Sequence, residues 1–521
     1  MVLRPQNARE GGERSYKFEC LPARVFLSLD RAKLSKIVNL QATCRLLRLV
    51  WMKKGTFKMK WETLLNSTRI RKLFGGRPSQ KSEDDLRSEF DRDYGRTIFS
   101  TPVRRLQDKA QVFPLVQDDF VRTRLTHSME VSSVSRTLGA WVAKWMVEEG
   151  ELHPDSQSSV EVITATCGVL HDLGNPPFGH AGEEAISEWC KNAPGVQNLF
   201  ASRPQLFGDF LGWNGNAQTI RLIGKLQVLV DEFGLNLTCA TMSTACKYIG
   251  SCESVSSDFH DRSKIGYFFS ESELIEKVRE ATGTGSARHP LTLLVEASDD
   301  IVYACVDLED GIKKRLITWD ELEVNLLEIA GPCEHTRKAI KAAKELVGDS
   351  LDGLARDEGL IQAFRTYAIV EAARAALEEF KSSYSLIMDG NYHKEVVKEF
   401  SASGLIRACK TVGRKVVYEC DEVLKVELAG RKVIQDLLST FWEGATDYPR
   451  FSKLKPFAKK AFNLMSNNYR KVFESAMNRI DRAEADAAAI DAYCRVQLIC
   501  DYLAGMTDSF ATNLHKKLTN D

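Results

Sequence analysis

The chain has 521 residues, which is enough for a large core and for two or three domains. Its 71 Lys and Arg balance 71 Asp and Glu, so net charge gives no argument for nucleic acid or a membrane surface as a partner. Thirteen cysteines are scattered without a CxxC pair, which excludes a zinc ribbon and a disulfide scaffold. We therefore expect a cytoplasmic protein, since no apolar run reaches about 18 residues and no signal peptide is evident.

The first 58 residues form a basic N-terminal extension with 13 Lys and Arg against 4 Asp and Glu. Three interpretations stay open: a nucleic-acid-binding arm, an Arg-rich targeting segment, or residues that precede a natural start at Met59 and lie outside the native fold. An amphipathic pattern begins at Met59 with MKWETLL. Residues 59–90 are expected to hold a helix and then a flexible linker, because residues 75–90 are rich in Gly, Pro and Ser.

The next strong pattern is helical and runs from Thr126 to Glu149. Its apolar residues recur with a period near 3.6, and His127 lies on their side of the helix. A single histidine on such a face is more often a satisfied core residue than a metal ligand. Whether His127 is a metal ligand therefore depends on which side chains the other helices place beside it.

A second apolar helix is predicted over residues 160–172 and ends in His171 and Asp172. The sequence continues as LGNPPFG, and Gly and Pro cannot extend a helix, so the pair should lie where the helix breaks into a tight loop. Beyond the loop a helix should form again. It would carry His180 and Glu183, three residues apart, on one face.

A third helix is predicted to start at Pro290, with Asp299 on its apolar face. A carboxylate there is costly to bury unless it is paired or bound to a cation. Two imidazoles and two carboxylates suit a divalent ion such as Mn²⁺, Mg²⁺, Co²⁺ or Fe²⁺ and leave coordination positions open. The alternative is four unrelated residues, and the proposed ligands are His127, His171, Asp172 and Asp299.

Several longer segments, in order along the chain, resemble the deoxyguanosine triphosphate triphosphohydrolase (dGTPase) family of the HD-domain superfamily. They are RRLQDKAQVFPL, VRTRLTHSMEV, HDLGNPPFGHAGE, NGNAQTIRL and YLAGMTDSFA. The resemblance runs from about Met59 to Phe510 and does not cover residues 1–58. It implies an all-α HD-domain helical fold with additional C-terminal helices: an HD catalytic core over 91–320, and a helical region over 321–521 that completes the site and an oligomer interface.

The resemblance also implies a reaction: metal-dependent hydrolysis of dGTP, or of dNTPs generally, at the α-phosphorus. The products would be a deoxynucleoside and tripolyphosphate, and the activity would control dNTP pools. By motif position the four ligands named above hold the metal, and His180 and Glu183 are the catalytic pair. No Gly-rich nucleotide loop is present in the sequence, so phosphate recognition must rest on the metal and on side chains.

Substrate-binding residues follow from the same resemblance. Arg124 matches a contact to the α-phosphate, and a guanidinium can bind two oxygens at once. The sugar would be surrounded by Gln111, Tyr303 and Asp307, with Tyr303 excluding a 2′-hydroxyl. Weaker matches near the substrate are Asn216, Gln218, Arg221, Lys264 and Tyr267. Asp300 stands where vertebrate-type relatives have a phosphate-binding lysine, which moves triphosphate contacts to Lys264 or to a neighbouring subunit.

Partners and alternatives complete the expectations. A homo-oligomer is implied, with a hexamer among the options, and single-stranded nucleic acid is a candidate effector; no membrane partner is expected. One alternative function is another HD phosphohydrolase, acting on a nucleoside monophosphate, a cyclic nucleotide or an alarmone, against which Gln111, Tyr303 and Asp307 argue. The other is a nucleic-acid-binding HD regulator without turnover, which the complete set of ligands disfavours.

Overall fold

The computed structural model describes residues 57–77, 84–113, 115, 121–227, 231–348, 351–453 and 455–519. The predictions for the basic extension before Phe57 lie outside these residues. Within the described ranges the regular elements are helices, and isolated bridges such as Ala110 with Thr123 are the only β-type pairing. The expected all-α fold is thus confirmed. In the same ranges no helix is both long and apolar enough to cross a bilayer.

The helices divide into three runs along the sequence. The first run is α2 (Trp61–Leu64), α3 (Ile70–Leu73), α4 (Glu89–Ile98), α5 (Thr101–Arg105), α6 (Arg124–Glu148) and α7 (Gln157–Leu170). The second is α8 (Gly179–Asn192), α9 (Gly208–Leu211), α10 (Gly215–Arg221), α11 (Cys239–Ala245), α12 (Ser272–Thr282) and α13 (Pro290–Lys313).

The third run is α14 (Trp319–Ala330), α15 (Glu334–Val347), α16 (Gly353–Ser382), α17 (Tyr384–Met388), α18 (Val396–Glu399), α19 (Ser403–Gly413), α20 (Asp421–Asp447), α21 (Ala458–Leu464), α22 (Asn467–Asn478), α23 (Ala487–Ala504) and α24 (Asp508–Thr519). Short turns of other helix types are η2 (Leu106–Asp108), η3 (Pro154–Ser156), η4 (Gln197–Phe200), η5 (Pro204–Phe207), η6 (Leu222–Leu226), η7 (Cys252–Ser254), η8 (His260–Arg262), η9 (Phe269–Glu271) and η10 (Arg414–Tyr418).

The three helices expected to carry the metal ligands are confirmed, with small shifts at their ends. α6 starts at Arg124 because the side chain of Thr123 accepts a hydrogen bond from the backbone of Thr126 and caps the helix. α7 ends at Leu170, one residue before His171. α13 begins at Pro290, which suits a first helical position because its missing N–H would have no partner there.

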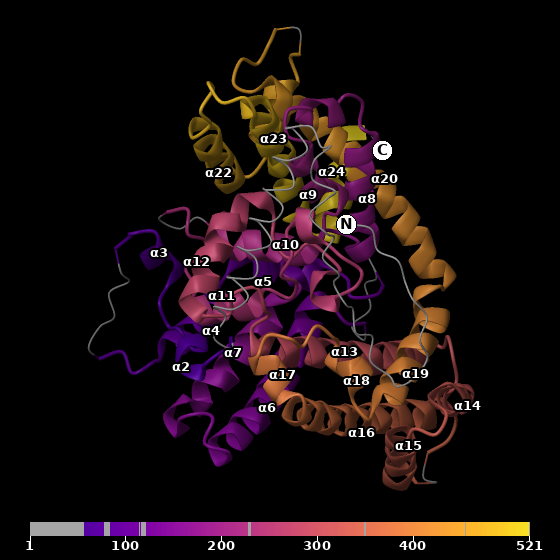
Figure 1. The fold of residues 1–521 in the computed structure, drawn as a ribbon. Coiled ribbons are helices and arrows are strands. Elements are labelled where there is room, and N and C mark those ends of the chain that lie inside the picture. The colour runs from indigo at the N-terminus through magenta and orange to yellow at the C-terminus, as the bar shows by residue number, and fades with distance from the viewer. Residues whose placement is uncertain are drawn as a thin grey trace, which may run out of the picture. The chain divides into compact units, whose positions relative to one another are not determined.

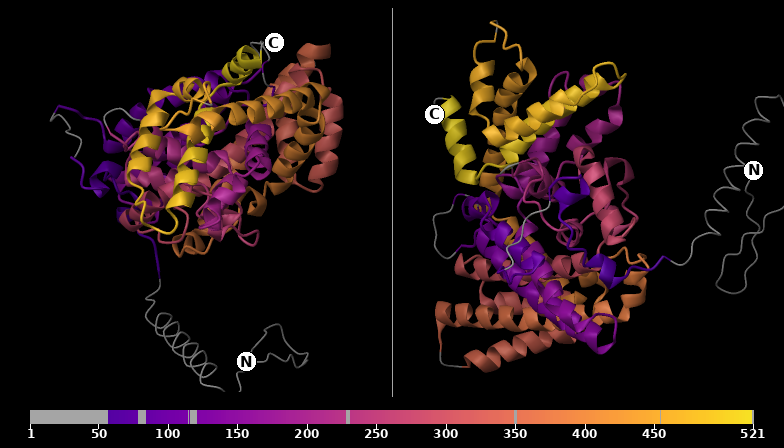
Figure 2. Two further views of the ribbon diagram at one scale, coloured as in Figure 1. Left: turned by 90° about the horizontal axis from the view of Figure 1, so that it is seen from above. Right: turned by 90° about the vertical axis from the view of Figure 1, so that its left-hand side faces the viewer.

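The hydrophobic core falls into two large clusters. The first packs between α6, α7, α13, α16 and α19, and the second between α8, α20, α22, α23 and α24. Figure 1 places α6, α13, α16 and α19 in the lower part of the view and α8, α20, α23 and α24 in the upper part. The right-hand view of Figure 2 keeps the yellow C-terminal helices on the upper side. Residues 171–178, here called the HD loop, connect α7 of the first cluster to α8 of the second.

Residues 58–521 form one unit of mutual contacts. The first core cluster draws on residues from Met59 to Val412, so its packing crosses the boundary expected at residue 320. The division into residues 59–90, 91–320 and 321–521 stays a prediction.

Candidate active site

A cavity of about 350 Å³ lies where α6, α13 and the HD loop meet the start of α8. That volume is within the range of about 300–1,000 Å³ typical of small-molecule sites. Most of the predicted site residues line it: Gln111, Arg124, His127, His171, Asp172, His180, Glu183, Asn216, Lys264, Asp299 and Tyr303. Residues that are up to 192 positions apart in the sequence therefore face one space.

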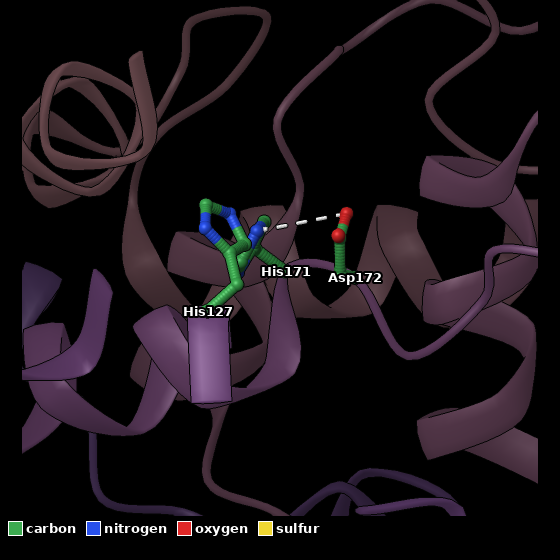
Figure 3. Close-up of side chains that lie close together, drawn as sticks. All are labelled: His127, His171 and Asp172. Atoms are coloured by element: carbon green, nitrogen blue, oxygen red, sulfur yellow. Dashed lines mark ion pairs between the residues drawn. The ribbon is translucent and has the colours of Figure 1, made fainter. Parts of the chain in front are cut away.

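The four predicted metal ligands converge on one side of this cavity. One ligand atom from each of His127, His171 and Asp172 lies within 4.8 Å of the others. Figure 3 shows the two imidazole rings next to each other, with the Asp172 carboxylate 3.6 Å from Nε2 of His171. From α13, Oδ1 of Asp299 lies 3.3 Å from Nε2 of His127 and 3.4 Å from Nε2 of His171.

The hydrogen bonds of His171 fit a metal ligand. Its Nδ1 donates to the carbonyl oxygen of Gly168 at 2.8 Å, so a neutral ring carries its lone pair on Nε2. Nε2 is buried, and no hydrogen-bond partner for it lies among the described residues. Burial disfavours the charged ring, but the carboxylates of Asp172 and Asp299 outweigh it and raise the pKa of His171 to about 9. A divalent cation would replace that proton, so the donor set fits such an ion.

Asp172 is held in place by two donors. Oδ2 accepts a hydrogen bond from Arg124, and Oδ1 accepts one from the side-chain amide of Asn175 at 2.6 Å. Burial alone would raise the pKa of Asp172, but the charges of His171 and Arg124 prevail and lower it to about 2. Nε of Arg124 has no hydrogen-bond partner in the described part of the chain, so this guanidinium can still bind an anion.

The predicted catalytic pair lies at the start of α8. Nδ1 of His180 is 3.3 Å from Oε2 of Glu183, and Oε1 of Glu183 accepts a hydrogen bond from the backbone N–H of Gly215 at 2.6 Å. The carboxylate is buried, whereas the imidazole is 81% exposed. Gly179, with φ of +57°, precedes His180, and this left-handed conformation favours glycine; a Cβ there would also lie 2.7 Å from the guanidinium of Arg124.

Two of the three residues expected around a sugar, Gln111 and Tyr303, also line the cavity. Tyr303 lies one turn after Asp299 on α13 and lines the cavity, and Oε1 of Gln111 is buried without a hydrogen-bond partner in the described ranges. Asp307 lies one turn further along and behind the lining. Its carboxylate accepts a hydrogen bond from Tyr418, whose ring centroid is 5.8 Å from that of Tyr303. Burial raises the pKa of Asp307 to about 8.

Three of the weaker predictions, Gln218, Arg221 and Tyr267, lie outside the cavity lining. The side-chain amide of Gln218 donates to Asp501 at 3.1 Å, and the Tyr267 ring has the guanidinium of Arg279 5.2 Å from its centroid. Both contacts connect parts of the protein interior. They give these side chains a packing role in this structure, and a substrate contact for them stays a prediction.

Arg221 belongs to the same buried network, and we expect its loss to destabilise the fold. Its guanidinium is 2.6 Å from Asp501 and 2.9 Å from Glu271, and all three side chains are buried. Arg221→Ala would leave the buried Asp501 carboxylate without its cation and Glu271 with Lys225 alone, so the free energy of unfolding should fall by about 3–5 kcal/mol. Chemical denaturation followed by circular dichroism measures this change.

Arg431→Ala is the matched control for that measurement. Arg431 binds Glu188 through two hydrogen bonds on the surface, where an ion pair contributes little. Equal losses of stability for the two variants would contradict the buried role of Arg221.

The sequence interpretation missed several lining residues, among them Asn175, Lys247, Tyr418 and Glu427. Lys247 lies 3.5 Å from Asp299 but 52 residues before it, and no periodicity connects the two. Asn175 is different, because it lies inside the HDLGNPP segment and could have been found there. Asp300 forms an ion pair with Lys410 on α19, so a lysine does lie at this position, although it comes from another helix.

Comparison with known proteins gives independent evidence of the family to which the chain belongs. Residues 399–517 match the model of the phosphohydrolase-associated domain. A deoxyguanosinetriphosphate triphosphohydrolase-like protein of Listeria monocytogenes is 34% identical over 473 residues, covering 88% of this chain and 99% of the relative. A protein of the same name from Pseudomonas aeruginosa is 30% identical over 481 residues, covering 88% and 99%. The chain belongs to the dGTPase family.

Another relative of the dGTPase family is the deoxyguanosinetriphosphate triphosphohydrolase of Klebsiella pneumoniae, which is 30% identical over 502 residues and is covered over 98% of its length. The resemblance stated from sequence motifs is therefore confirmed. The phosphohydrolase-associated match covers α19, which packs in the first core cluster, and α20 to most of α24, which pack with α8 in the second. In this dGTPase family member the cavity lies between that cluster and the one that carries the HD residues.

Proposed function

We propose that the protein hydrolyses deoxynucleoside triphosphates, with dGTP favoured, in a metal-dependent reaction that lowers dNTP pools. Water would add to the α-phosphorus, the bond from that phosphorus to the 5′-oxygen would break, and deoxynucleoside and tripolyphosphate would leave. The observation that carries the proposal is the convergence of His127, His171, Asp172 and Asp299 in one cavity of a dGTPase family member, with His180 beside them.

A divalent cation such as Mn²⁺, Mg²⁺, Co²⁺ or Fe²⁺, held by the four ligands, would polarise an α-phosphate oxygen and neutralise developing charge. The side chains of the protein add further positive charge to the same space. Arg124 is placed to bind phosphate oxygens through the part of its guanidinium that does not contact Asp172. Lys264 and Lys247, which also line the cavity, would bind the rest of the triphosphate.

The His180–Glu183 pair supplies the proton transfer. Glu183 is fixed by the backbone of Gly215, so its second oxygen can accept the Nδ1 proton of His180 and orient the ring. Nε2 of His180 is then free to give a proton to the departing 5′-oxygen or to take one from water. The proton balance closes, because water supplies the hydroxyl for phosphorus and the nucleoside leaves with its 5′-oxygen protonated.

Product analysis tests the proposal. The purified protein is incubated with each dNTP and Mn²⁺ or Mg²⁺, and products are resolved by ion chromatography and ³¹P NMR. Tripolyphosphate and deoxynucleoside in equal amounts are expected. Orthophosphate from a nucleoside monophosphate, a cyclic nucleotide or an alarmone would instead assign another HD phosphohydrolase. Absence of any product, together with salt-dependent DNA binding, would assign a nucleic-acid-binding regulator.

Tyr303→Ala is expected to relax discrimination against ribonucleotides. The proposed role of the ring is to fill the space that a 2′-hydroxyl would need, so its removal should raise the ratio of kcat/KM for GTP to that for dGTP by about 10–200-fold. Steady-state kinetics with both nucleotides measure the ratio. Tyr303→Phe keeps the ring and should keep the selectivity, and unchanged rejection of GTP by the alanine variant would contradict the role.

Assembly and location stay predictions. A symmetric homo-oligomer, with a hexamer among the options, is supported by exposed leucines on α20, where Leu424 is 43% and Leu428 70% exposed. A single-stranded nucleic acid effector and a cytoplasmic location have no further support beyond the sequence.

A further inference from the structure

The first residue of α24 contacts both loops that carry proposed active-site residues. Asp508 is 3% exposed, and its carboxylate accepts two backbone hydrogen bonds: Oδ2 from Ala110 at 2.9 Å and Oδ1 from Phe178 at 3.0 Å. Ala110 immediately precedes Gln111, and Phe178 lies two residues before His180. One side chain from the C-terminal region therefore joins two segments that are 68 residues apart.

A buried lysine, Lys109, connects the same segments through hydrogen bonds of its own. Lys109 is 3% exposed, and its Nζ donates to the carbonyl oxygens of Asn175 at 2.5 Å and Ala504 at 2.8 Å. Its own carbonyl oxygen accepts a hydrogen bond from the backbone N–H of Arg124 at 2.9 Å. The segment before Gln111, the HD loop, the start of α6 and the end of α23 are thereby connected.

The conformation of the HD loop explains why it needs such support. Phe178 has φ of +62°, a left-handed conformation that is unfavourable for a residue with a bulky side chain and persists when its surroundings hold it. The N–H of this strained residue is the group that Asp508 binds. Loss of the carboxylate would allow residues 178–180 to relax and would displace His180 from Glu183.

We infer that Asp508, assisted by Lys109, is a positioning residue that fixes His180 and Gln111 for the proposed reaction. No residue after Glu427 is among the described residues that line the cavity, so α24 acts through hydrogen bonds to the loops and touches no substrate. The inference rests on the proposed function for its catalytic part, whereas the connection between the loops can be measured in the absence of any substrate.

Two substitutions of Asp508 should lower kcat to different extents. Asp508→Asn keeps one acceptor oxygen and should retain one of the two backbone hydrogen bonds, and Asp508→Ala retains neither. We expect kcat for dGTP to fall by roughly 10-fold in the first variant and about 10²-fold in the second, because displacement of a catalytic group by about 1 Å has that cost. KM should change less than about 3-fold, because Gln111 is only one of the proposed substrate contacts and the cation ligands, Arg124 and Tyr303 stay in place.

Amide hydrogen exchange is the readout that does not depend on activity. In both variants the exchange rates at Ala110 and Phe178 should rise, with the larger increase in Asp508→Ala, whereas amides in the middle of α13 should be unchanged. If the Asp508 variants do not fold, Lys109→Met takes their place. It removes the hydrogen bonds to Asn175 and Ala504 and should raise the exchange rates at Ala110 and Phe178. Asn513→Ala, an exposed change on the same helix, is the control and should alter neither exchange nor kcat.

Each result decides a separate point. Unchanged exchange at Ala110 and Phe178 would overturn the connection, and faster exchange with normal kcat would overturn its positioning role. A KM that rises as much as kcat falls would also overturn it, because it would indicate general loosening of the cavity. If the wild-type protein turns over no dNTP, the proposed function fails, and the exchange data alone then decide whether Asp508 joins the loops.

Discussion

His180→Ala is expected to lower kcat by on the order of 10³-fold while leaving the bound cation in place. The imidazole is the group that exchanges a proton with the reacting oxygens in the proposed mechanism, and water would replace it poorly. It is not among the side chains that converge on the cation, since it pairs with Glu183 on α8. Steady-state kinetics and elemental analysis of the same preparation measure both quantities.

His153→Ala is the matched control for this variant. His153 is exposed, lies beside Asp155 and takes no part in the cavity, so its removal should leave kcat unchanged. The combination of His180→Ala with Glu183→Gln sharpens the result. If Glu183 acts only by orienting His180, the double variant should be no slower than His180→Ala alone. A near-normal rate for His180→Ala would refute the catalytic assignment.

His127→Ala is expected to remove the cation itself. The ring comes from α6, is 1% exposed and has its Nε2 3.3 Å from Oδ1 of Asp299, so its loss opens the coordination set on one side. Affinity for Mn²⁺ should fall by more than the roughly 10–100-fold that changes around a metal centre cost, and turnover should fall with it. Isothermal titration calorimetry with Mn²⁺ and elemental analysis after dialysis measure the affinity and the retained metal.

Recovery of activity at high Mn²⁺ distinguishes a His127→Ala protein that has lost its metal from one that has lost its fold. A folded His127→Ala protein should regain part of its activity at high Mn²⁺, whereas His180→Ala should not respond to added metal. Wild-type metal content in His127→Ala after dialysis would show that this histidine is an ordinary core residue, which is the alternative that its position on an apolar face leaves open.

Much of the fold and the convergence of the four predicted ligands could be predicted because each depends on local regularity. The period near 3.6 placed His127 and Asp299 on the buried sides of their helices, and Gly174 and Pro176 predicted the break after His171. The all-α architecture was implied by the family resemblance, and the same stripes agree with it. Three separate local patterns therefore sufficed to predict a convergence that spans 172 residues.

The remaining contacts could not be predicted because their partners lie far apart without any repeat between them. Asp508 binds Phe178 across 330 positions, and Tyr418 binds Asp307 across 111. Gln218 is a different case: its motif suggested the substrate, its side chain is buried and donates a hydrogen bond to Asp501, and a substrate contact for it stays a prediction. Which side of a short helix such as α10 meets the cavity depends on packing against α23, which the sequence of α10 does not specify.

The passage of the HD loop between the two core clusters has a mechanical consequence. In the proposed reaction the cation ligands come from α6, α13 and the HD loop, and the proton-transfer pair comes from α8 of the second cluster, so a nucleotide bound in the cavity would contact elements of both clusters. On the proposed function, a bound nucleotide would thus add contacts between the two clusters and would stabilise the folded protein by mass action.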